Sequence, residues 1–248
     1  MKKDKVRQIA VILSIVLMII VNVLANALPL NGQNTGAISD RFDVYFTPAG
    51  YVFSIWGLIY IGLIAYAVYQ ALPAQRENPR LRRIGWWVVI GSLANTVWIF
   101  LWHYEVFPLT IIAMLLLLVT LIITYVTLGV NRIKVSTAER FAVHVPFSIY
   151  LGWITVATVA NAAALLDFLK SNAWGISEVS WLCVFLAAVL VIAGAMNFIR
   201  RDIAYTLVIL WAVAGIGLKH AAVPGVAAAA WITFALVAVS LVYALFKN

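Results

Sequence analysis

The stretch FTPAGYVFSIWGLIY, residues 46–60, combines a start that contains Pro48 and Gly50 with a stripe of large aromatic side chains. Its apolar part starts beside Pro48 and then carries Phe53, Trp56 and Tyr60 at intervals of three and four residues. Proline is tolerated at a helix start because its missing N–H would have no partner there. Positions that face lipid need only be apolar, so an aromatic stripe at helical spacing indicates a buried helix face.

The composition around this stretch is that of an integral membrane protein. The chain has 248 residues, 65% of them hydrophobic and 10% charged, with a mean hydropathy of +1.03. A soluble domain carries about 25% charged residues, so this chain lacks the polar surface that water requires. The single cysteine, Cys183, lies in an apolar run and has no second cysteine for a disulfide or a metal site.

Eight apolar segments are long enough to cross a bilayer, whose hydrocarbon core of ~30 Å needs ~20 residues of helix. They are 8–28, 51–71, 84–103, 107–130, 142–165, 180–199, 203–219 and 222–246. Backbone groups in lipid must form hydrogen bonds within their own segment. The expected fold is therefore an all-α polytopic helical bundle.

The basic residues predict the orientation of this bundle. With the N-terminus in the cytoplasm, all but three of the 17 Lys and Arg fall in cytoplasmic loops and termini; Arg41, Lys170 and Lys219 lie outside. The positive-inside rule predicts this asymmetry, and it explains the net charge of +8 without a nucleic-acid partner. We expect a multi-pass protein of the cell membrane with both termini in the cytoplasm. Segments 29–50 and 166–179 are then the longest outside loops.

Stripes of polar and aromatic residues also mark three other helices. They are Asn22 and Asn26 in the first segment, Asn95, Trp98 and Trp102 in the third, and Tyr150, Trp153, Ala157 and Asn161 in the fifth. At 1.5 Å per residue, the stripes lie within roughly 10 Å of the outer helix ends, under loop 29–50. A cavity walled by Trp and Tyr with a few amides suits a flat, largely apolar ligand with one or two polar edges.

A packing role explains the same residues without a ligand. Trp and Tyr collect at membrane interfaces, and we expect Trp102 and Trp174 to be such interface anchors. Inward-facing Asn residues often only bridge helices and contribute about 0.6 kcal/mol each. Spacing alone leaves both interpretations open.

Three motifs in order resemble the TspO/MBR family, the tryptophan-rich sensory proteins related to the mitochondrial translocator protein. FTPAGYVFSIWGLIY is similar to the second-helix signature, SLANTVWIFLW (92–102) to the third-helix pattern and VPFSIYLGWITVATVAN (145–161) to the fifth-helix pattern. The resemblance implies a five-helix core, residues 1–166, with a pocket capped by the loop between the first two helices. Residues 167–248 are expected to add an extension of about three transmembrane helices.

The resemblance also implies a ligand and its site. Family members bind porphyrins, and eukaryotic members bind cholesterol and synthetic ligands. The ligand-binding residues implied by the motifs are Trp56, Asn95, Trp98 and Trp153, and the stripes add Phe53, Tyr60 and Asn161. Pro48, Ala49, Tyr60, Pro146 and Asn161 match motif positions that shape the bundle. Loop 29–50 lacks the family's tryptophans and has Phe42, Tyr45 and Phe46 instead, which puts a stacking contact from the loop in doubt.

The acidic residues support neither catalysis nor ion-coupled transport. All nine Asp and Glu lie in loops or at helix ends, whereas a proton- or cation-coupled transporter usually keeps an ionisable residue within the bilayer. Asp40, Arg41 and Asp43 in loop 29–50 are candidates for ion pairs that latch the loop.

The sequence also gives no sign of an enzyme. His103, His144 and His220 show no metal-ligand spacing, and Ser148 lies in a helix without an adjacent base. We expect no catalytic residues, no metal and no required cofactor, with a porphyrin or other tetrapyrrole as the candidate ligand.

Three functions remain in competition. The leading hypothesis is a membrane binding or sensor protein for a porphyrin or a similar planar hydrophobic ligand. The alternative is an eight-helix small-molecule transporter. A third hypothesis is a structural or regulatory role, in which the three C-terminal helices dock on another membrane protein; a homodimer is also a candidate, and membrane lipid is a partner in every case.

Overall fold

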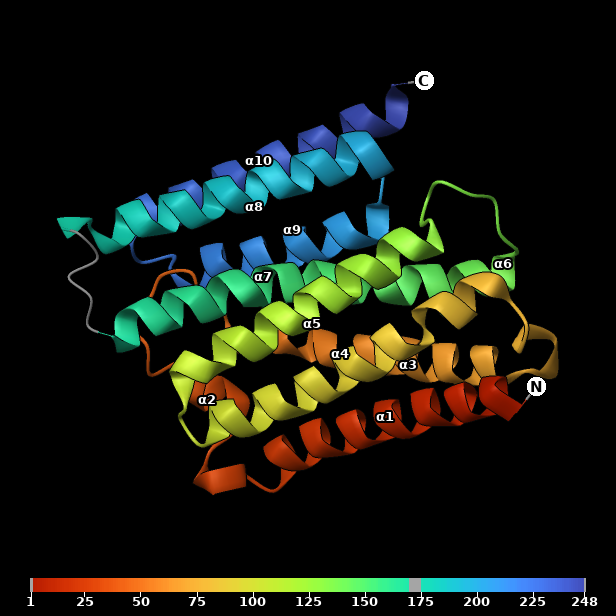
Figure 1. The fold of residues 1–248 in the computed structure, drawn as a ribbon. Helices are drawn as coiled ribbons and strands as arrows, with labels where there is room; N and C mark the ends of the chain where they lie inside the picture. Colours follow the sequence, from red (N-terminus) through yellow and green to blue (C-terminus); the bar gives the residue numbers. More distant parts are fainter. Residues whose placement is uncertain (1, 170–174, 248) are drawn as a thin grey trace.

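The computed structural model describes residues 2–169 and 175–247, and these form a bundle of long helices (Figure 1). The helices are α1 (Lys2–Ala27), α3 (Ile55–Ala71), α4 (Pro79–His103), α5 (Phe107–Leu128), α7 (Val145–Phe168), α8 (Glu178–Arg200), α9 (Ile203–Lys219) and α10 (Pro224–Phe246). Within the described ranges there is no strand. The predicted all-α polytopic membrane fold is confirmed. Lys170 and Trp174, which the sequence analysis used, lie outside the described residues.

Short elements join these helices. The loop after α1 contains η1 (Leu30–Gly32) and α2 (Thr35–Ser39), and η2 (Gly50–Ser54) leads into α3. A further short helix, η3 (Pro73–Gln75), precedes α4. Before α7 lie α6 (Thr137–Glu139) and the π-helical η4 (Arg140–His144). The apolar segments around α3 and α7 are therefore longer than those helices alone, at 50–71 and 137–168.

All eight predicted segments are helical in the structure. Seven of them, among the described residues, are long and apolar enough to cross a membrane, and α9 is a shorter apolar helix of 17 residues. The predicted ends differ mainly where charged residues continue a helix past its apolar run. Thus α4 starts at Pro79 rather than at residue 84, because the Asn78 side chain accepts hydrogen bonds from the N–H groups of Arg80 and Leu81.

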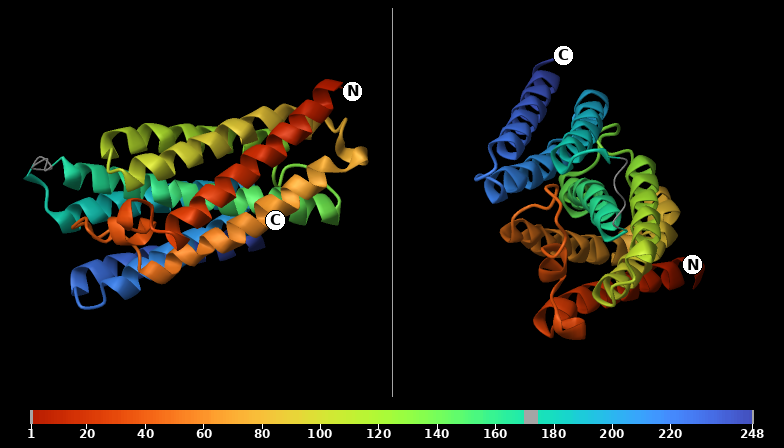
Figure 2. Two further views of the ribbon diagram at one scale, coloured as in Figure 1. Left: turned by 90° about the horizontal axis from the view of Figure 1, so that it is seen from below. Right: turned by 90° about the vertical axis from the view of Figure 1, so that its left-hand side faces the viewer.

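Five helices form a closed ring in which each contacts the next. The order is α1, α4, α5, α7 and α3, and α3 closes the ring by packing on α1. Outside the ring, α9 packs on α7, and α10 contacts both α9 and α8. The end-on view in Figure 2 shows these C-terminal helices on the side of α7 away from α1.

One glycine permits the close contact between α7 and α9. A Cβ at Gly152 would lie 2.9 Å from the Tyr205 carbonyl oxygen and 3.2 Å from Val208 Cβ. Small residues at such crossings let helix backbones approach closely in a membrane, where packing rather than the hydrophobic effect drives helix association.

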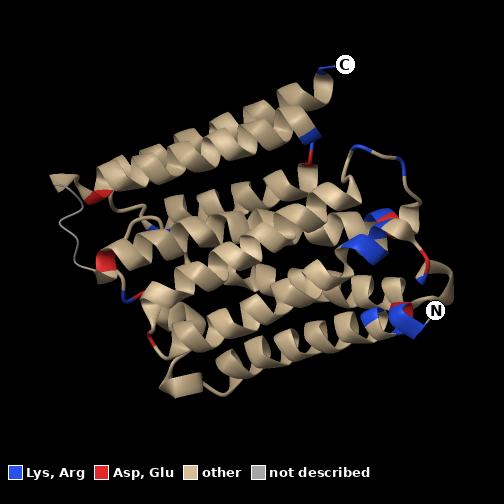
Figure 3. Ribbon diagram, viewed as in Figure 1, with Lys and Arg blue, Asp and Glu red and all other residues tan. Residues whose placement is uncertain are grey.

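The two ends of the bundle differ in charge. Both chain termini lie at one end (Figure 1), and Figure 3 shows most Lys and Arg at that same end. We call it the basic end, and we call the opposite end, where the loop after α1 and the start of α8 lie, the acidic end. The assignment of the basic end to the cytoplasm stays a prediction of the positive-inside rule.

Candidate functional site

Two adjoining hollows lie near the acidic end of the ring. The inner hollow, about 50 Å³, is lined by Thr35, Ser39, Pro48, Phe53, Trp56, Asn95, Trp98, Trp102, Met114, Trp153, Ile154, Val156, Ala157, Ala160 and Asn161. The lateral hollow, about 440 Å³, adds α1 and is lined by Asn22, Val23, Asn26, Ala27, Thr35, Gly36, Phe53, Trp56, Tyr60, Trp98 and Ile99. Because Phe53, Trp56 and Trp98 line both, we treat the two hollows as one candidate site.

The structure brings the predicted site residues together. Of the seven, six line the inner hollow, namely Phe53, Trp56, Asn95, Trp98, Trp153 and Asn161; the seventh, Tyr60, lines the lateral hollow. They come from η2, α3, α4 and α7, which are far apart in the sequence. Their role in ligand binding stays a prediction, but their convergence on a common space is a property of the fold.

Aromatic contacts hold the wall of the site. The Trp56 ring stacks on Tyr60 with centroids 5.6 Å apart and meets Trp153 edge-on at 6.3 Å. Phe53 meets Trp153 edge-on at 5.7 Å. Each such pair contributes about 0.5–1.5 kcal/mol beyond its buried area. The half-buried Trp56 therefore keeps one ring face engaged while it borders open space.

The expectation that Trp102 is an interface anchor is wrong. Its side chain is only 4% exposed, and its ring stacks on Trp98 at 5.2 Å. Its Nε1 donates a hydrogen bond to the Thr35 carbonyl oxygen at 3.2 Å. The loop after α1 folds back over the end of α4, so Trp102 belongs to the wall of the inner hollow. Distance from the helix end, which suggested an anchor, does not reveal such a covering loop.

The amides of the site bridge helices, as the packing interpretation expected. Asn161 accepts a hydrogen bond from Trp98 Nε1 at 2.8 Å and donates one to Thr110 Oγ1 at 2.8 Å, which joins α7 to α4 and α5. Asn22 of α1 donates to Asn95 Oδ1 of α4 at 2.7 Å. These groups fix the geometry of the wall and are already engaged without a ligand.

Trp153 carries an available donor in the site. The residue lines the inner hollow and is 3% exposed, yet its Nε1 has no hydrogen-bond partner within residues 2–169 and 175–247. Buried polar groups nearly always have a partner, and an unpaired one costs about 1–3 kcal/mol. An acceptor on a bound molecule would satisfy this N–H.

The loop after α1, which we call the lid (residues 29–50), is fastened to the end of α4. His103 is fully buried, with Nε2 3.0 Å from Thr35 Oγ1 and Nδ1 3.1 Å from the Leu30 carbonyl oxygen. A carbonyl only accepts, so Nδ1 carries the proton. Both ring nitrogens are thus engaged, and His103 attaches the lid to the end of α4 through two hydrogen bonds. Nearby, Arg41 forms an ion pair with Glu105 at 2.9 Å.

The lid is also fastened to α9. Lys219 Nζ lies 2.6 Å from Asp40 Oδ1, the Ala49 N–H donates to the Gly215 carbonyl oxygen at 3.2 Å, and Trp211 Nε1 donates to the Val52 carbonyl oxygen, just past the lid, at 3.1 Å. The predicted ion pairs of Asp40 and Arg41 are therefore present. What the sequence did not reveal is that one of the C-terminal helices supplies a partner.

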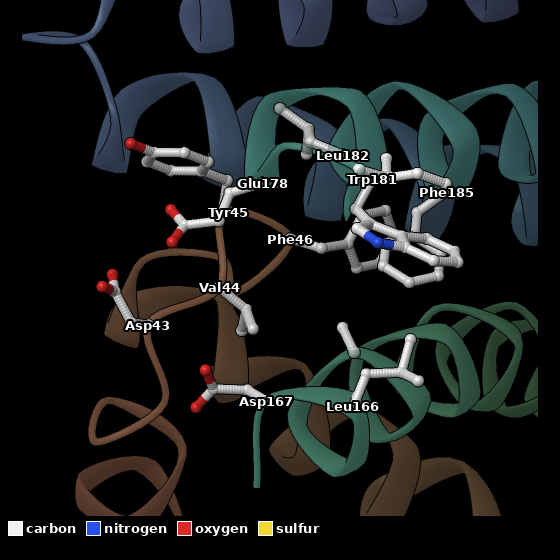
Figure 4. Close-up of a pocket in the computed structure, with 12 residues that line it drawn as sticks. Asp43, Val44, Tyr45, Phe46, Leu166, Asp167, Glu178, Trp181, Leu182 and Phe185 are labelled. Carbon is white, nitrogen blue, oxygen red and sulfur yellow. The ribbon is translucent and has the colours of Figure 1, made fainter. Parts of the chain in front are cut away.

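A third hollow, about 240 Å³, lies between the lid, α7 and α8 (Figure 4). The carboxylates of Asp43, Asp167 and Glu178 border it beside the rings of Tyr45, Phe46, Trp181 and Phe185. Phe185 stacks on Trp181 at 5.5 Å and meets Phe46 edge-on at 5.7 Å. Sequence analysis missed this hollow because no periodic stripe within one segment connects these residues.

A buried carboxylate lies at the start of α9, at the basic end of the bundle. Asp202 is 2% exposed, and its Oδ2 accepts hydrogen bonds from Tyr125 and Ser148, both at 2.7 Å. Its Oδ1 accepts from the Tyr205 N–H at 3.1 Å and so caps α9. Its place at a helix end is as predicted, but its burial and its contact with Ser148 are not visible in the sequence.

Comparison with known proteins identifies one match. A family model described as TSPO-like protein matches residues 8–243. The matched region runs through α8 and α9 and ends within α10, in addition to the ring. No curated protein and no solved structure matches the chain.

Proposed function

Because the chain belongs to the family of TSPO-like proteins, we propose that this multi-pass membrane protein binds a porphyrin or a similar planar hydrophobic molecule at the candidate site. The observation that supports this proposal best is the meeting of Phe53, Trp56, Trp98 and Trp153 around a common space. Flat aromatic walls favour a flat aromatic ligand because ring stacking adds to the burial of apolar area.

The sizes of the two hollows favour one position for the proposed ligand. Small-molecule sites are about 300–1,000 Å³, so the inner hollow, at about 50 Å³, is too small and the lateral hollow, at about 440 Å³, is large enough. We place the ring system of the ligand in the lateral hollow against Trp56 and Trp98. Deeper insertion requires the lid or Trp56 to move.

The polarity of the site restricts the ligand further. No charged side chain lines either hollow among the described residues. A charged group buried there would lose its hydration without a partner, which is unfavourable by several kcal/mol. The part of the ligand that is buried is therefore neutral. A small substituent with a hydrogen-bond acceptor would extend from the ring system into the inner hollow, where it would meet Trp153 Nε1. Carboxylates, where the ligand has them, remain at the mouth of the lateral hollow.

The test is a titration of the purified, detergent-solubilised chain with protoporphyrin, followed by the change in porphyrin absorbance. We expect saturable binding that Trp56→Ala weakens roughly tenfold, as the loss of about 1.4 kcal/mol of ring contact predicts. Trp153→Phe keeps an aromatic ring but removes the N–H, and we expect a loss of similar size. Trp86→Phe is the matched control, because Trp86 is 52% exposed and lies outside both hollows.

Two results would contradict the proposal. Equal affinities in all four proteins would place the porphyrin elsewhere on the chain. An absence of saturable porphyrin binding, together with substrate flux in proteoliposomes, would favour the eight-helix transporter instead.

A further inference from the structure

A fourth hollow, about 610 Å³, lies at the basic end, where the loop after α5 meets the corner between α8 and α9. Arg132 and Lys134 line it from the loop, and Arg200 and Arg201 line it from the corner. A smaller hollow of about 240 Å³ shares Arg201 and adds Arg140. Five cationic residues from three segments therefore line two adjoining hollows, which share Asn131 and Arg201.

None of these five cations takes part in an ion pair among the described residues, where the ion pairs of the basic end involve Arg7, Arg80 and Arg82. Arg200 lies over the Tyr125 ring, 5.6 Å from its centroid. The smaller hollow contains one carboxylate, Asp202, which accepts hydrogen bonds from Tyr125 and Ser148. One carboxylate leaves an excess of positive charge, so an anion that bridges the cations gains their combined attraction.

Two further polar features occur at the same place. His144 lines the smaller hollow and is 4% exposed, but its Nε2 has no hydrogen-bond partner in the described part of the chain. Arg201 adopts a φ of 52° where α8 ends, a position at which glycine is favoured.

Apolar side chains border the cationic ones. Phe141, Ile203 and Leu207 line the smaller hollow and are 64%, 42% and 54% exposed. A free inorganic anion would gain nothing from these residues. A molecule with a charged head and an apolar tail would contact both groups at once.

We propose that this basic hollow binds the phosphate-bearing head group of an anionic membrane phospholipid, with the acyl chains along Phe141, Ile203 and Leu207. Basic pockets between transmembrane helices are suited to such head groups. The lipid would connect the loop after α5, which belongs to the ring, with the corner between α8 and α9. This proposal is independent of the porphyrin site, which lies at the opposite end of the bundle.

The test compares thermal unfolding of the full chain in neutral detergent with added phosphatidylglycerol, phosphatidylcholine or inorganic phosphate. We expect phosphatidylglycerol alone to raise the Tm. Arg132→Gln/Lys134→Gln should weaken this response more than tenfold in lipid concentration, because each basic residue near an anionic lipid contributes roughly fivefold. Lys3→Gln/Lys5→Gln removes the same charge from the basic end, outside the hollow, and should retain the response.

Three outcomes would overturn the proposal. An equal loss in both double variants would indicate general attraction to a basic surface. An equal Tm rise with inorganic phosphate would make a soluble anion the ligand. A wild-type chain that responds identically to both lipids would have no head-group site. If Arg132→Gln/Lys134→Gln unfolds without lipid, Arg140→Gln serves as the second variant, and lipids retained by the wild type are counted by native mass spectrometry.

Discussion

The five-helix ring and the contact between the ring and α9 differ in how much space they leave between helices. Within the ring, amide and indole groups bridge neighbouring helices around open space, as Asn161 does between Trp98 and Thr110. At the contact with α9, glycines remove the space, since Cβ atoms at Gly152 and Gly215 would meet their neighbours at 2.9 Å and 2.2 Å. Close glycine contacts also occur within the ring, at Gly85 and Gly91, and Asp202 adds a polar bridge at the start of α9. The two regions therefore differ in where open space remains and share both kinds of contact.

The C-terminal helices also differ among themselves. Only 28% of the residues in the apolar windows of α8 and α10 are buried, compared with 50% in α4 and 56% in the segment that contains α7. In contrast, α9 packs against α7, α8 and α10 and contacts η2. Thus α9 connects the ring and lid to the rest of the chain, while α8 and α10 present apolar surface to lipid or to a partner. A division of the chain after residue 166 into core and extension stays a prediction.

The largest effect is expected when the hydrogen bonds of Asp202, which join α9 to α5 and α7, are removed. Asp202→Ala removes the acceptor of Tyr125 and Ser148 and the cap of α9, so we expect unfolding to become easier by about 3 kcal/mol. Chemical unfolding in detergent micelles measures this change. Asp202→Asn keeps one oxygen to cap α9 and places an amide N–H donor where Tyr125 and Ser148 found an acceptor, so it should lose less than Asp202→Ala. Equal losses would show that the joint does not depend on these hydrogen bonds.

The next effect separates α9 from the segment that leads into α3. Gly215→Ala places a methyl group 2.2 Å from Val52 Cγ2, so the two elements must move apart at a cost of about 1–3 kcal/mol. Hydrogen exchange of residues 46–54 should then accelerate. Adding Val52→Ala makes room for the methyl group and should restore slow exchange. A double variant no better than the single one would contradict this account of the contact.

A smaller effect is expected inside the ring. Asn161→Leu leaves Trp98 Nε1 and Thr110 Oγ1 without their partner, and interhelical hydrogen bonds in membranes contribute about 0.6 kcal/mol each, with a maximum of about 1.7. We expect a lower Tm and weaker porphyrin binding. Thr158→Val, nearly one turn earlier, removes only a bond to the Ile154 carbonyl oxygen of the same helix and is the control. Equal changes in Tm and affinity for Asn161→Leu and Thr158→Val would show that Asn161 does not stabilise the ring by bridging its helices.

The smallest effect concerns the ion pairs of the lid. Lys219→Gln breaks the pair with Asp40, whose side chain is 55% exposed, and exposed pairs contribute about 0–1 kcal/mol. We expect faster hydrogen exchange in residues 35–45, with the difference from wild type disappearing at high salt. Arg41→Gln breaks the pair with Glu105 on the ring side of the lid. Its effect on hydrogen exchange, set beside that of Lys219→Gln, shows which of the two ion pairs holds the lid more strongly. A difference that persists at high salt would indicate a contact other than the ion pair.

Sequence patterns predicted what depends on one segment at a time. Apolar runs located all eight helices, and the stripes on four of them located residues around the candidate site. The patterns failed where the fold brings a distant segment over a residue. Trp102 is covered by the lid, Asp202 is enclosed by α5 and α7, and the hollow near Trp181 combines three segments. The periodicity of residues within one helix cannot predict which loop will cover the end of that helix.

The shortness of α9 has a consequence for the surrounding bilayer. Its 17 residues span about 25 Å, whereas the average hydrocarbon core is ~30 Å thick. Ile203, Leu207, Trp211 and Leu218 form its exposed stripe, so acyl chains meet this short helix directly. A helix shorter than the hydrocarbon core can be accommodated by local thinning of the bilayer at a modest cost. We therefore expect the membrane to be thinner beside α9 than beside the seven longer helices.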